Sequence, residues 1–247
     1  MKMTASIAWL KILLKNANTK KHAYGDQMKR YALLLLALSS FYSNAQDNLT
    51  ALGTDKIKQW EKEVFSGETV YEQVSLEGEP VFRALSNKSA SGLVLKKRID
   101  LQQTPFIQWR WRISKQLPNL KEQTKAGDDY AARIYLVIED GFMGLKTKAL
   151  NYVWSSSQVQ GSVWNNAYVG ENVKMLAVQG QSASTHQWYS EKRNVYQDMI
   201  RYFGDKGASA ANLKAYRYID AVAIMTDTDN SGLTAESYYG DIVFSAE

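Results

Sequence analysis

An acidic, turn-forming loop follows an apolar segment near the C-terminus, and its spacing is typical of cation ligands. Asp227 to Gly232 reads D-T-D-N-S-G. This matches the first half of a calcium loop, in which alternating oxygens coordinate the ion and a glycine permits the turn. The second half is missing, because Tyr238 stands where a bidentate glutamate is expected. Either Asp227, Asp229 and Asn230 hold Ca²⁺, or these side chains bond the backbone amides of a turn.

A second acidic stretch stands at the entrance to another apolar segment. Asp128 and Asp129 precede the run AARIYLVI, which carries Arg133 inside it. Because an unpaired buried charge is costly, we expect Arg133 to have an acidic partner. The structural interpretation pairs Asp128 or Asp129 with Arg133 or Arg193. We also expect this stretch and the loop after Asp227 to meet at one end of the fold.

Paired carboxylates also suit carbohydrate hydrolysis or lysis. Such chemistry needs two carboxyl groups on the order of 5–10 Å apart across a cleft. Sequence spacing gives no such distance, so no catalytic residue is assigned. The candidate acids are Asp128, Asp129, Glu191, Asp227, Asp229 and Asp241.

Aromatic residues offer a third chemistry, because sugar rings stack their C–H faces on aromatic side chains. Tyr152, Trp154 and Trp164 lie beside a segment rich in serine and asparagine. Trp109 and Trp111 alternate with isoleucines and are expected in the core instead. The candidate ligand-binding residues are therefore Asp128, Asp129, Arg133, Tyr152, Trp154, Trp164 and Arg193.

Short alternating segments at intervals of about ten residues predict a mostly β protein, a sandwich or a barrel. Strands are expected over residues 69–74, 80–85, 93–95, 105–114, 131–138, 149–155, 173–179, 222–225 and 241–244. One amphipathic helix is expected near residues 190–203. There Val195, Met199 and Tyr202 share one face, and Gly204 ends the pattern.

The N-terminal region predicts an export signal. Residues 28–45 are expected to form a signal peptide, with a basic start, an apolar centre from Tyr31 to Phe41 and small residues that predict cleavage before Gln46. Residues 1–27 precede it as an upstream extension or a longer leader. Residues 46–247 are expected to form a single domain, located in the periplasm or secreted.

Composition excludes several classes of function. The 247 residues hold 30 Lys+Arg, 25 Asp+Glu, two histidines and no cysteine. Seven of the basic residues and one acidic residue precede Gln46, so the remainder carries 23 basic and 24 acidic residues. Nucleic-acid binding through a basic surface loses its support. A zinc site with several histidines is disfavoured, and no cofactor other than calcium is predicted.

Several blocks resemble one bacterial family of unknown function, DUF3047. They include WRWRI, KAGDDYAARIYLVI, ALNYVWSS and the ending IDAVAIMTDTDNSG…YYGDIVF. The resemblance implies an exported, mostly β single domain. The ending is also remotely similar to the last strands of jelly-roll carbohydrate-binding modules. We therefore expect a single β-sandwich of jelly-roll type.

These observations favour a non-catalytic binding domain for a glycan or another envelope ligand. One alternative is a carbohydrate-active hydrolase or lyase that uses an Asp/Glu pair. Another is a structural envelope protein with no small-molecule site. No nucleic-acid partner is expected, and no membrane span is expected after processing.

Overall fold

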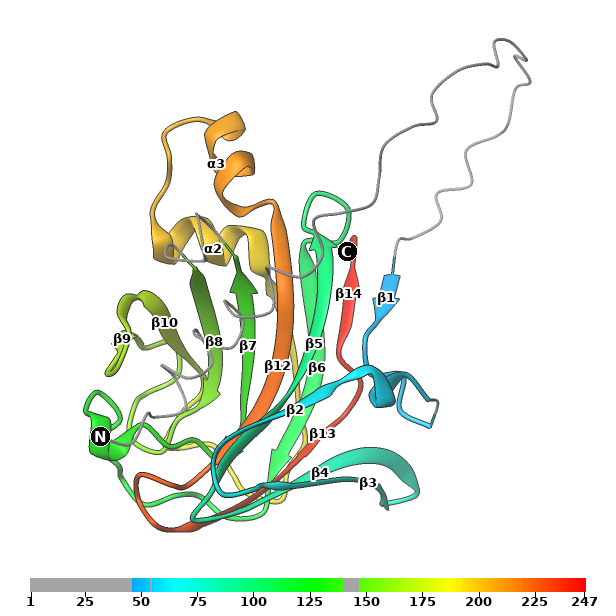
Figure 1. Ribbon diagram of the computed structural model, residues 1–247, viewed down its shortest axis with the longest axis vertical. Coiled ribbons are helices and arrows are strands. Elements are labelled where there is room, and N and C mark those ends of the chain that lie inside the picture. Colours follow the sequence, from blue (N-terminus) through cyan, green and yellow to red (C-terminus); the bar gives the residue numbers. More distant parts are fainter. Residues whose placement is uncertain (1–45, 54, 140–146) are drawn as a thin grey trace.

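Strands dominate the part of the chain that the computed structural model describes, which is residues 46–53, 55–139 and 147–247 (Figure 1). Within these residues the strands form two seven-stranded sheets. In the first sheet the order is β1-β14-β6-β13-β4-β3, and β11 also pairs with β6. Its strands are β1 (Gln46–Asn48), β3 (Val70–Leu76), β4 (Glu79–Asn87), β6 (Phe106–Ile113), β11 (Tyr189–Asn194), β13 (Thr234–Tyr239) and β14 (Val243–Ser245).

The second sheet has the order β2-β5-β12-β7-β8-β10-β9. Its described strand pairs are antiparallel except for β8 and β10, which are parallel. Its strands are β2 (Glu61–Ser66), β5 (Ala90–Asp100), β7 (Arg133–Ile138), β8 (Lys148–Trp154), β9 (Val163–Asn166), β10 (Gly170–Gln179) and β12 (Tyr218–Asp227).

The main core lies between the two sheets. Ile107, Trp109, Trp111 and Ile113 alternate along β6, and all four are buried. Side chains of the second sheet, among them Leu136 of β7, face them in the same cluster. The prediction of a single β-sandwich of jelly-roll type is confirmed, and the alternation of β6 is its clearest local cause.

Two α-helices lie together at one end of the sandwich (Figure 1). They are α2 (Val195–Phe203) and α3 (Ser209–Tyr216), and the short 3-10 helices are η2 (Asp55–Gln59) and η3 (Lys125–Gly127). The Asn194 side chain caps α2 by accepting a hydrogen bond from the Gln197 amide at 3.0 Å. Among the described helices, none is long and apolar enough to cross a membrane.

The helix predicted near residues 190–203 is only partly correct. It begins at Val195, because Tyr189–Asn194 form β11 and pair with the edge of β6, where Tyr189 lies opposite Trp111. A second helix, α3, lies in a segment for which the sequence allowed a loop or a weak helix, residues 206–215. The predicted extension, signal peptide and cleavage site lie outside or at the border of the described residues.

The second sheet also has an apolar face that points away from the main core. Tyr135 and Val137 of β7 lie on it, whereas their neighbours Ile134 and Leu136 belong to the main core. Ala223 of β12 and neighbouring residues of β5, β8 and β10 continue it. We call this the outer face of the second sheet, and it carries the polar groups described below.

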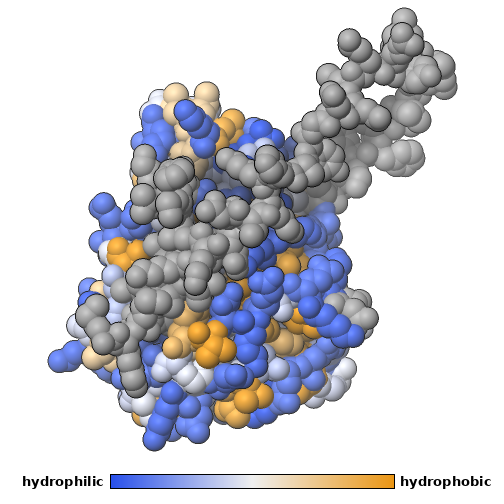
Figure 2. Space-filling view, in the orientation of Figure 1, coloured by the Kyte–Doolittle hydropathy of each residue, from blue (hydrophilic) through white to orange (hydrophobic). Residues whose placement is uncertain are grey.

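The coloured part of the surface in the view of Figure 2 is largely hydrophilic, with scattered hydrophobic spots. The exposed large hydrophobic residues of the described part are Val64, Val70, Val159 and Val163. Scattered single valines of this kind are normal on a protein surface and need no partner.

Candidate functional site

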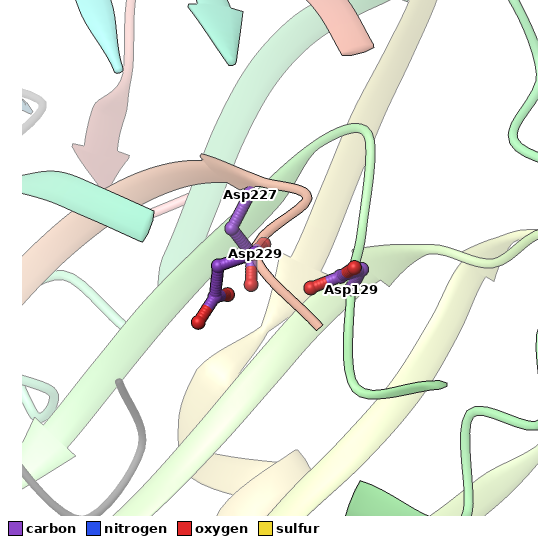
Figure 3. A group of neighbouring side chains, drawn as sticks. All are labelled: Asp129, Asp227 and Asp229. Carbon is purple, nitrogen blue, oxygen red and sulfur yellow. The ribbon is translucent and has the colours of Figure 1, made fainter. Parts of the chain in front are cut away.

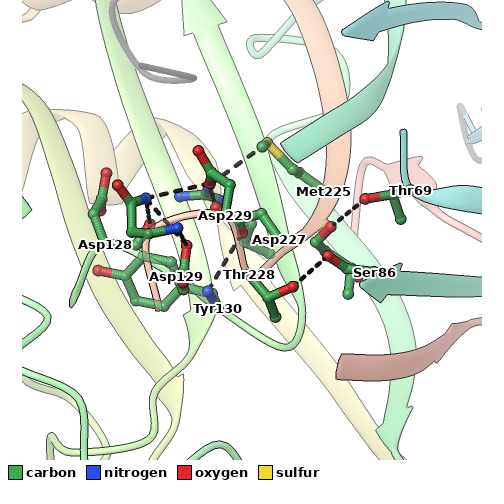
Figure 4. Close-up of polar contacts among 12 residues, drawn as sticks. Thr69, Ser86, Asp128, Asp129, Tyr130, Met225, Asp227, Thr228 and Asp229 are labelled. Atoms are coloured by element: carbon green, nitrogen blue, oxygen red, sulfur yellow. Dashed lines mark hydrogen bonds and ion pairs between the residues drawn. The ribbon is translucent and has the colours of Figure 1, made fainter. Parts of the chain in front are cut away.

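The two acidic loops meet at the end of the sandwich opposite the helices, as the sequence predicts (Figures 1 and 4). β12 and β7 are antiparallel with Met225 opposite Arg133, so the end of β12 lies beside the start of β7. The Asp129 carboxylate accepts hydrogen bonds from the backbone amides of Ser231 at 2.6 Å and Asn230 at 3.2 Å. These bonds fasten the loop after β12 to the loop before β7.

Arg133 has the acidic partner that its apolar surroundings require. Its Nη2 atom forms an ion pair with the Asp227 carboxylate, and both side chains are fully buried. The backbone amide of Tyr130 also donates to Asp227, at 3.3 Å. The sequence predicted the need for a partner but named Asp128 or Asp129, whereas this partner comes from β12.

The electrostatics of this pair follow from its burial. Burial raises the pKa of Asp227 well above its ordinary value, and the Arg133 charge opposes that rise. Burial also disfavours the charge on Arg133, but Asp227 outweighs it and the pKa of Arg133 lies above its ordinary value. Because no water screens the two charges, they attract each other strongly. Removing either partner would leave a buried charge unpaired, which would strongly destabilise the fold.

Asp128 and Arg193 have separate structural partners. Both carboxylate oxygens of Asp128 accept from the Asn166 side-chain amide, at 3.2 and 3.1 Å. Arg193 donates to Asp198 at 2.6 and 2.9 Å, and Asp198 lies in α2 at the opposite end of the sandwich (Figure 1). The prediction that places Arg193 with the acidic loops is therefore wrong.

Tyr152 and Trp154 do not form an exposed aromatic platform. Both rings point into the main core, where their exposed fractions are 0% and 1%. Tyr152 stacks on Trp109 with ring centroids 5.3 Å apart, and Trp154 meets Tyr189 edge-on at 5.2 Å. The proposal of a sugar platform at Tyr152 and Trp154 is therefore wrong, because both faces of β8 are buried and these two side chains face the other sheet.

Three carboxylates gather at the junction of the acidic loops. Asp129, Asp227 and Asp229 each offer one oxygen within 4.8 Å of the others (Figure 3). Asn230, predicted as a ligand, turns its amide nitrogen toward Asp129 at 3.1 Å, while its oxygen accepts from the Tyr168 hydroxyl at 2.8 Å. Asp129 thus takes the place expected for Asn230, and Ca²⁺ at this cluster stays a prediction.

Asp229 is the most accessible acid of this cluster. Partial burial, followed by repulsion from Asp129, raises the pKa of Asp229 from 3.8 to about 6. It therefore holds a proton in mildly acidic solution, unlike an ordinary aspartate.

A group of polar side chains lies on the outer face beside this cluster. We call Tyr130, Arg133, Asn151 and Trp164 the outer-face polar group. Asn151 lies opposite Tyr135, two residues along β8 from the position opposite Arg133, so the two side chains are diagonal neighbours. The Tyr130 ring lies 5.0 Å from the Arg133 guanidinium carbon and 6.5 Å from the Trp164 ring.

This group contains an unusual number of unsatisfied polar atoms. The side chains of Tyr130, Arg133 and Asn151 are fully buried in the 247-residue chain, and Trp164 is 7% exposed. Among the described residues, ten buried side-chain atoms have no hydrogen-bond partner, and six of the ten belong to this group. They are the Tyr130 hydroxyl, Arg133 Nε and Nη1, Asn151 Nδ2 and Oδ1, and Trp164 Nε1. Native folds leave few buried polar atoms unpaired, so this concentration sets the group apart from the rest of the described residues.

The family of the chain follows from its sequence. Residues 58–243 match the model of DUF3047, a family described as proteins of unknown function. The chain belongs to DUF3047. The resemblance inferred from the sequence blocks is thereby confirmed, and it assigns no activity. No curated protein matches this DUF3047 chain.

Two solved structures are distantly similar to this DUF3047 chain. The cellulose-induced protein Cip1 is 10% identical, with 81% of this chain and 96% of that chain covered and a TM-score of 0.42. The xyloglucanase domain of NopAA, a type three effector from Sinorhizobium fredii, is 11% identical, with 84% and 100% covered and a TM-score of 0.40. Likeness at this level supports no argument about ligand or activity.

Asn151 and Tyr130 were missed by the sequence reasoning, although each left a signal. Asn151 is the one amide in an otherwise apolar and aromatic strand, ALNYVW, and alternation places it on the face opposite Tyr152. Tyr130 follows Asp129 directly and was treated as part of the strand entrance. Glu122 was missed as well. It is fully buried and accepts from the Ser156 amide at 2.6 Å, which gives it a structural role in that loop.

Proposed function

We propose that this protein is an exported, non-catalytic binding domain for a glycan or another envelope ligand, and that the ligand lies on the outer face of the second sheet. The observation that carries the proposal is the set of unpartnered atoms of Arg133 and Asn151. A buried polar group without a partner costs roughly 1–3 kcal/mol. A ligand that hydrogen-bonds these atoms recovers that free energy.

The chemistry of the group suits a polyhydroxylated ligand. An amide offers both donors and an acceptor, a guanidinium offers only donors, and a hydroxyl offers both. Sugar hydroxyls also donate and accept, so they can satisfy all three kinds of group. Apolar neighbours on the outer face, among them Val153, Met175 and Ala223, suit the C–H faces of a sugar ring.

The acids near this group favour binding over the hydrolase or lyase alternative. Glycoside hydrolysis needs one carboxyl group to supply a proton and a second to attack or to activate water. Asp227 is held by Arg133, and Asp129 accepts from the amides of the loop after β12. Carboxylates that close a loop and neutralise an arginine are less suited to either task.

Export is supported by the sequence alone. The basic start, the apolar stretch from Tyr31 to Phe41 and the small residues before Gln46 form the three parts of a secretory signal. The absence of cysteine fits an exported domain that relies on its core for stability. A periplasmic or secreted location would give the outer face access to envelope glycans.

A glycan array tests the proposal. The protein is purified after expression of the full 247-residue chain, and the array is probed with it and with two variants. We expect Asn151→Leu to weaken glycan binding by about tenfold or more, which is the loss expected for hydrogen bonds to a buried amide. The control Asn165→Ala changes an exposed asparagine of β9 and is expected to bind as the unmodified protein does.

Two outcomes would contradict the proposal. If no glycan binds any of the three proteins, the structural alternative gains support over a glycan-binding role. If a glycan binds and Asn151→Leu binds it equally well, the outer-face polar group is not the site.

A further inference from the structure

The free edges of the two sheets differ in how well they are protected. Within the described residues, β1, β3 and β11 of the first sheet and β2 and β9 of the second each pair with a strand on one side only. An edge strand presents unpaired backbone N–H and C=O groups, which can pair with a strand of another molecule. Proteins block such edges with short strands, charged side chains, prolines or bulges.

Four of these five edges carry one or more of these features. β1 and β9 are only three and four residues long. β2 (EKEVFS) and β11 (YSEKRN) each carry three charged side chains in a row. The pairing of β2 with β5 is also interrupted by a register shift between Val64 and Ser66. These four edges are therefore poor templates for a further strand.

β3 is the edge strand that lacks this protection. It reads VYEQVSL, and it pairs with β4 in an unbroken register over all seven residues. It holds no proline and one charged residue, Glu72, whose carboxylate accepts a hydrogen bond from Arg83 of β4 at 2.5 Å. Val70, Glu72, Gln73 and Ser75 are exposed, and the strand lies at the periphery of the molecule beside β4 (Figure 1). The edge of β3 is thus long, regular and accessible.

A second copy of β3 is complementary to this edge in the antiparallel direction. If the pair is centred on Gln73, all seven residues of each strand have a partner. The facing pairs are then Val70 with Leu76, Tyr71 with Ser75, Glu72 with Val74, and Gln73 with the Gln73 of the second copy. No charge stands directly opposite a like charge, which would disfavour the pair. The two Glu72 side chains are diagonal neighbours, and each has its own Arg83 as counter-ion.

We infer that the edge of β3 is a self-association surface, through which two copies of this chain pair β3 with β3 in the antiparallel direction. The pair has twofold symmetry, so both copies supply the same groups, and it joins their first sheets into one continuous sheet. Because β3 belongs to the first sheet, this pairing does not depend on the proposed glycan site on the second sheet. One strand pair is a small interface, and we expect weak, concentration-dependent dimers.

Charges introduced at the centre of the pair test the inference. Gln73 is exposed, so Gln73→Lys and Gln73→Glu should leave the fold intact, and each places two like charges opposite each other in the dimer. Sedimentation velocity is measured from about 1 μM to about 1 mM, with protein purified after expression of the full chain. We expect the unmodified protein to dimerise as its concentration rises, and each variant alone to need about a fivefold higher concentration.

Mixing the two variants distinguishes pairing of β3 with β3 from any other contact. An equimolar mixture of Gln73→Lys and Gln73→Glu should dimerise at least as readily as the unmodified protein, because opposite charges then face each other. The control Val163→Lys changes an exposed valine on the edge of β9 and should dimerise as the unmodified protein does.

Three results would overturn the inference. Monomers at every concentration would show that the edge of β3 stays unpaired. Equal dimerisation of Gln73→Lys alone would place the interface elsewhere on the molecule. A mixture that dimerises no better than either variant alone would show that β3 does not pair with a second β3.

Disulfide cross-linking tests the register. The chain has no cysteine, so a single introduced thiol can pair only with its counterpart in the second copy. In Gln73→Cys the two thiols stand directly opposite, with Cα atoms about 4.5–5.5 Å apart, within disulfide reach. In Val70→Cys they are six residues apart along the ladder, which is about 20 Å. We expect oxidation to cross-link the first variant and not the second, and equal cross-linking of both would contradict the inferred pairing.

Discussion

Arg133 is the residue on which both the stability and the proposed site depend. One side of its guanidinium is committed to Asp227, while Nε and Nη1 have no partner. Arg133 thus connects the end of the sandwich where the acidic loops meet to the outer face of the second sheet. Its two roles separate experimentally, because stability depends on the paired side and ligand binding on the unpaired atoms.

Replacing Arg133 alone should unfold the protein more easily. Arg133→Met leaves Asp227 buried without its counter-ion, and we expect a loss of about 3–5 kcal/mol in the free energy of unfolding, measured by urea denaturation. The double variant Arg133→Met/Asp227→Leu should recover most of that loss, since no charge is left buried. A single variant as stable as the unmodified protein would contradict the role given to this pair.

A surface ion pair provides the control for that experiment. Arg217 and Asp100 lie 2.6 Å apart, with side-chain exposed fractions of 37% and 24%. Exposed pairs contribute about 0–1 kcal/mol, so Arg217→Gln should change the unfolding free energy by no more than this.

Asp229 should make stability depend on pH in the opposite sense to an ordinary salt-bridged aspartate. Its folded-state pKa of about 6 exceeds the ordinary value of 3.8, so the folded state binds more protons between these values. Stability should therefore fall as the pH rises from about 4 to about 6. After allowance for partial exposure and screening, the effect is on the order of 1 kcal/mol.

Asp229→Asn is the matched variant for this pH effect. Thermal unfolding across pH 4–8 should show the variant losing the Asp229 contribution and being more stable than the unmodified protein near neutral pH. If both proteins show the same pH dependence, Asp229 does not titrate as described.

At the residue scale, the sequence showed that Arg133 needs a counter-ion, but it did not show which residue supplies it. The composition around Arg133 required a counter-ion, but nothing in the sequence showed that it is Asp227, 94 residues away and two residues beyond the position of β12 that faces Arg133. Tyr152 and Trp154 were assigned to a sugar platform because a segment rich in serine and asparagine follows them, and such a segment does not show that both faces of β8 are buried. Asn230 was assigned as a metal ligand because spacing does not say which end of an amide faces a carboxylate.

At the scale of elements, the contact between the loops before β7 and after β12 is the feature most open to test. Asp129 accepts hydrogen bonds from the amides of Asn230 and Ser231. In Asp129→Ala these partly buried donors lose their acceptor, and we expect faster hydrogen exchange at both amides, by severalfold to about tenfold, for a loss of about 1 kcal/mol.

A second loop serves as the internal control for hydrogen exchange. The Gly207 amide donates to Asp205 at 2.8 Å in the connection between α2 and α3, at the other end of the sandwich. Its exchange should be unchanged in Asp129→Ala. Faster exchange there as well would indicate global destabilisation rather than release of one loop.

Elements with strong alternation or a clear apolar run were predictable, and elements defined by pairing were not. β6 and the central strand β12 follow from their own residues. β13 reads T-A-E-S-Y-Y, and its strand character depends on pairing with β4 and β6, far away in sequence. β11 adjoins a good helix pattern, and only the free edge of β6 decides where strand ends and helix begins.

At the scale of the whole molecule, the sandwich could be predicted because strand spacing and family resemblance pointed to the same fold. The order of strands in the two sheets could not, since each sheet combines segments from both halves of the chain. The location of the proposed site also depends on this order. β7, β8, β10 and β9 must be neighbours before Arg133, Asn151 and Trp164 form a group.

The N-terminal prediction also concerns the whole molecule. Mass spectrometry of the protein recovered from the periplasm or medium should give an N-terminus at Gln46 and a chain of net charge −1, counted from the sequence. An intact N-terminal peptide from upstream of Met28 in the exported protein would contradict this processing.

The most direct test of the central claim measures stability and binding together in Asn151→Leu. The buried Asn151 amide has no partner for either of its polar atoms, so it costs stability unless a ligand pairs with it. We predict that Asn151→Leu unfolds at a higher urea concentration, by about 1 kcal/mol or more in unfolding free energy, and that it loses glycan binding. A variant that is less stable than the unmodified protein, or that binds glycan equally well, would contradict the assignment of the outer face as a ligand site.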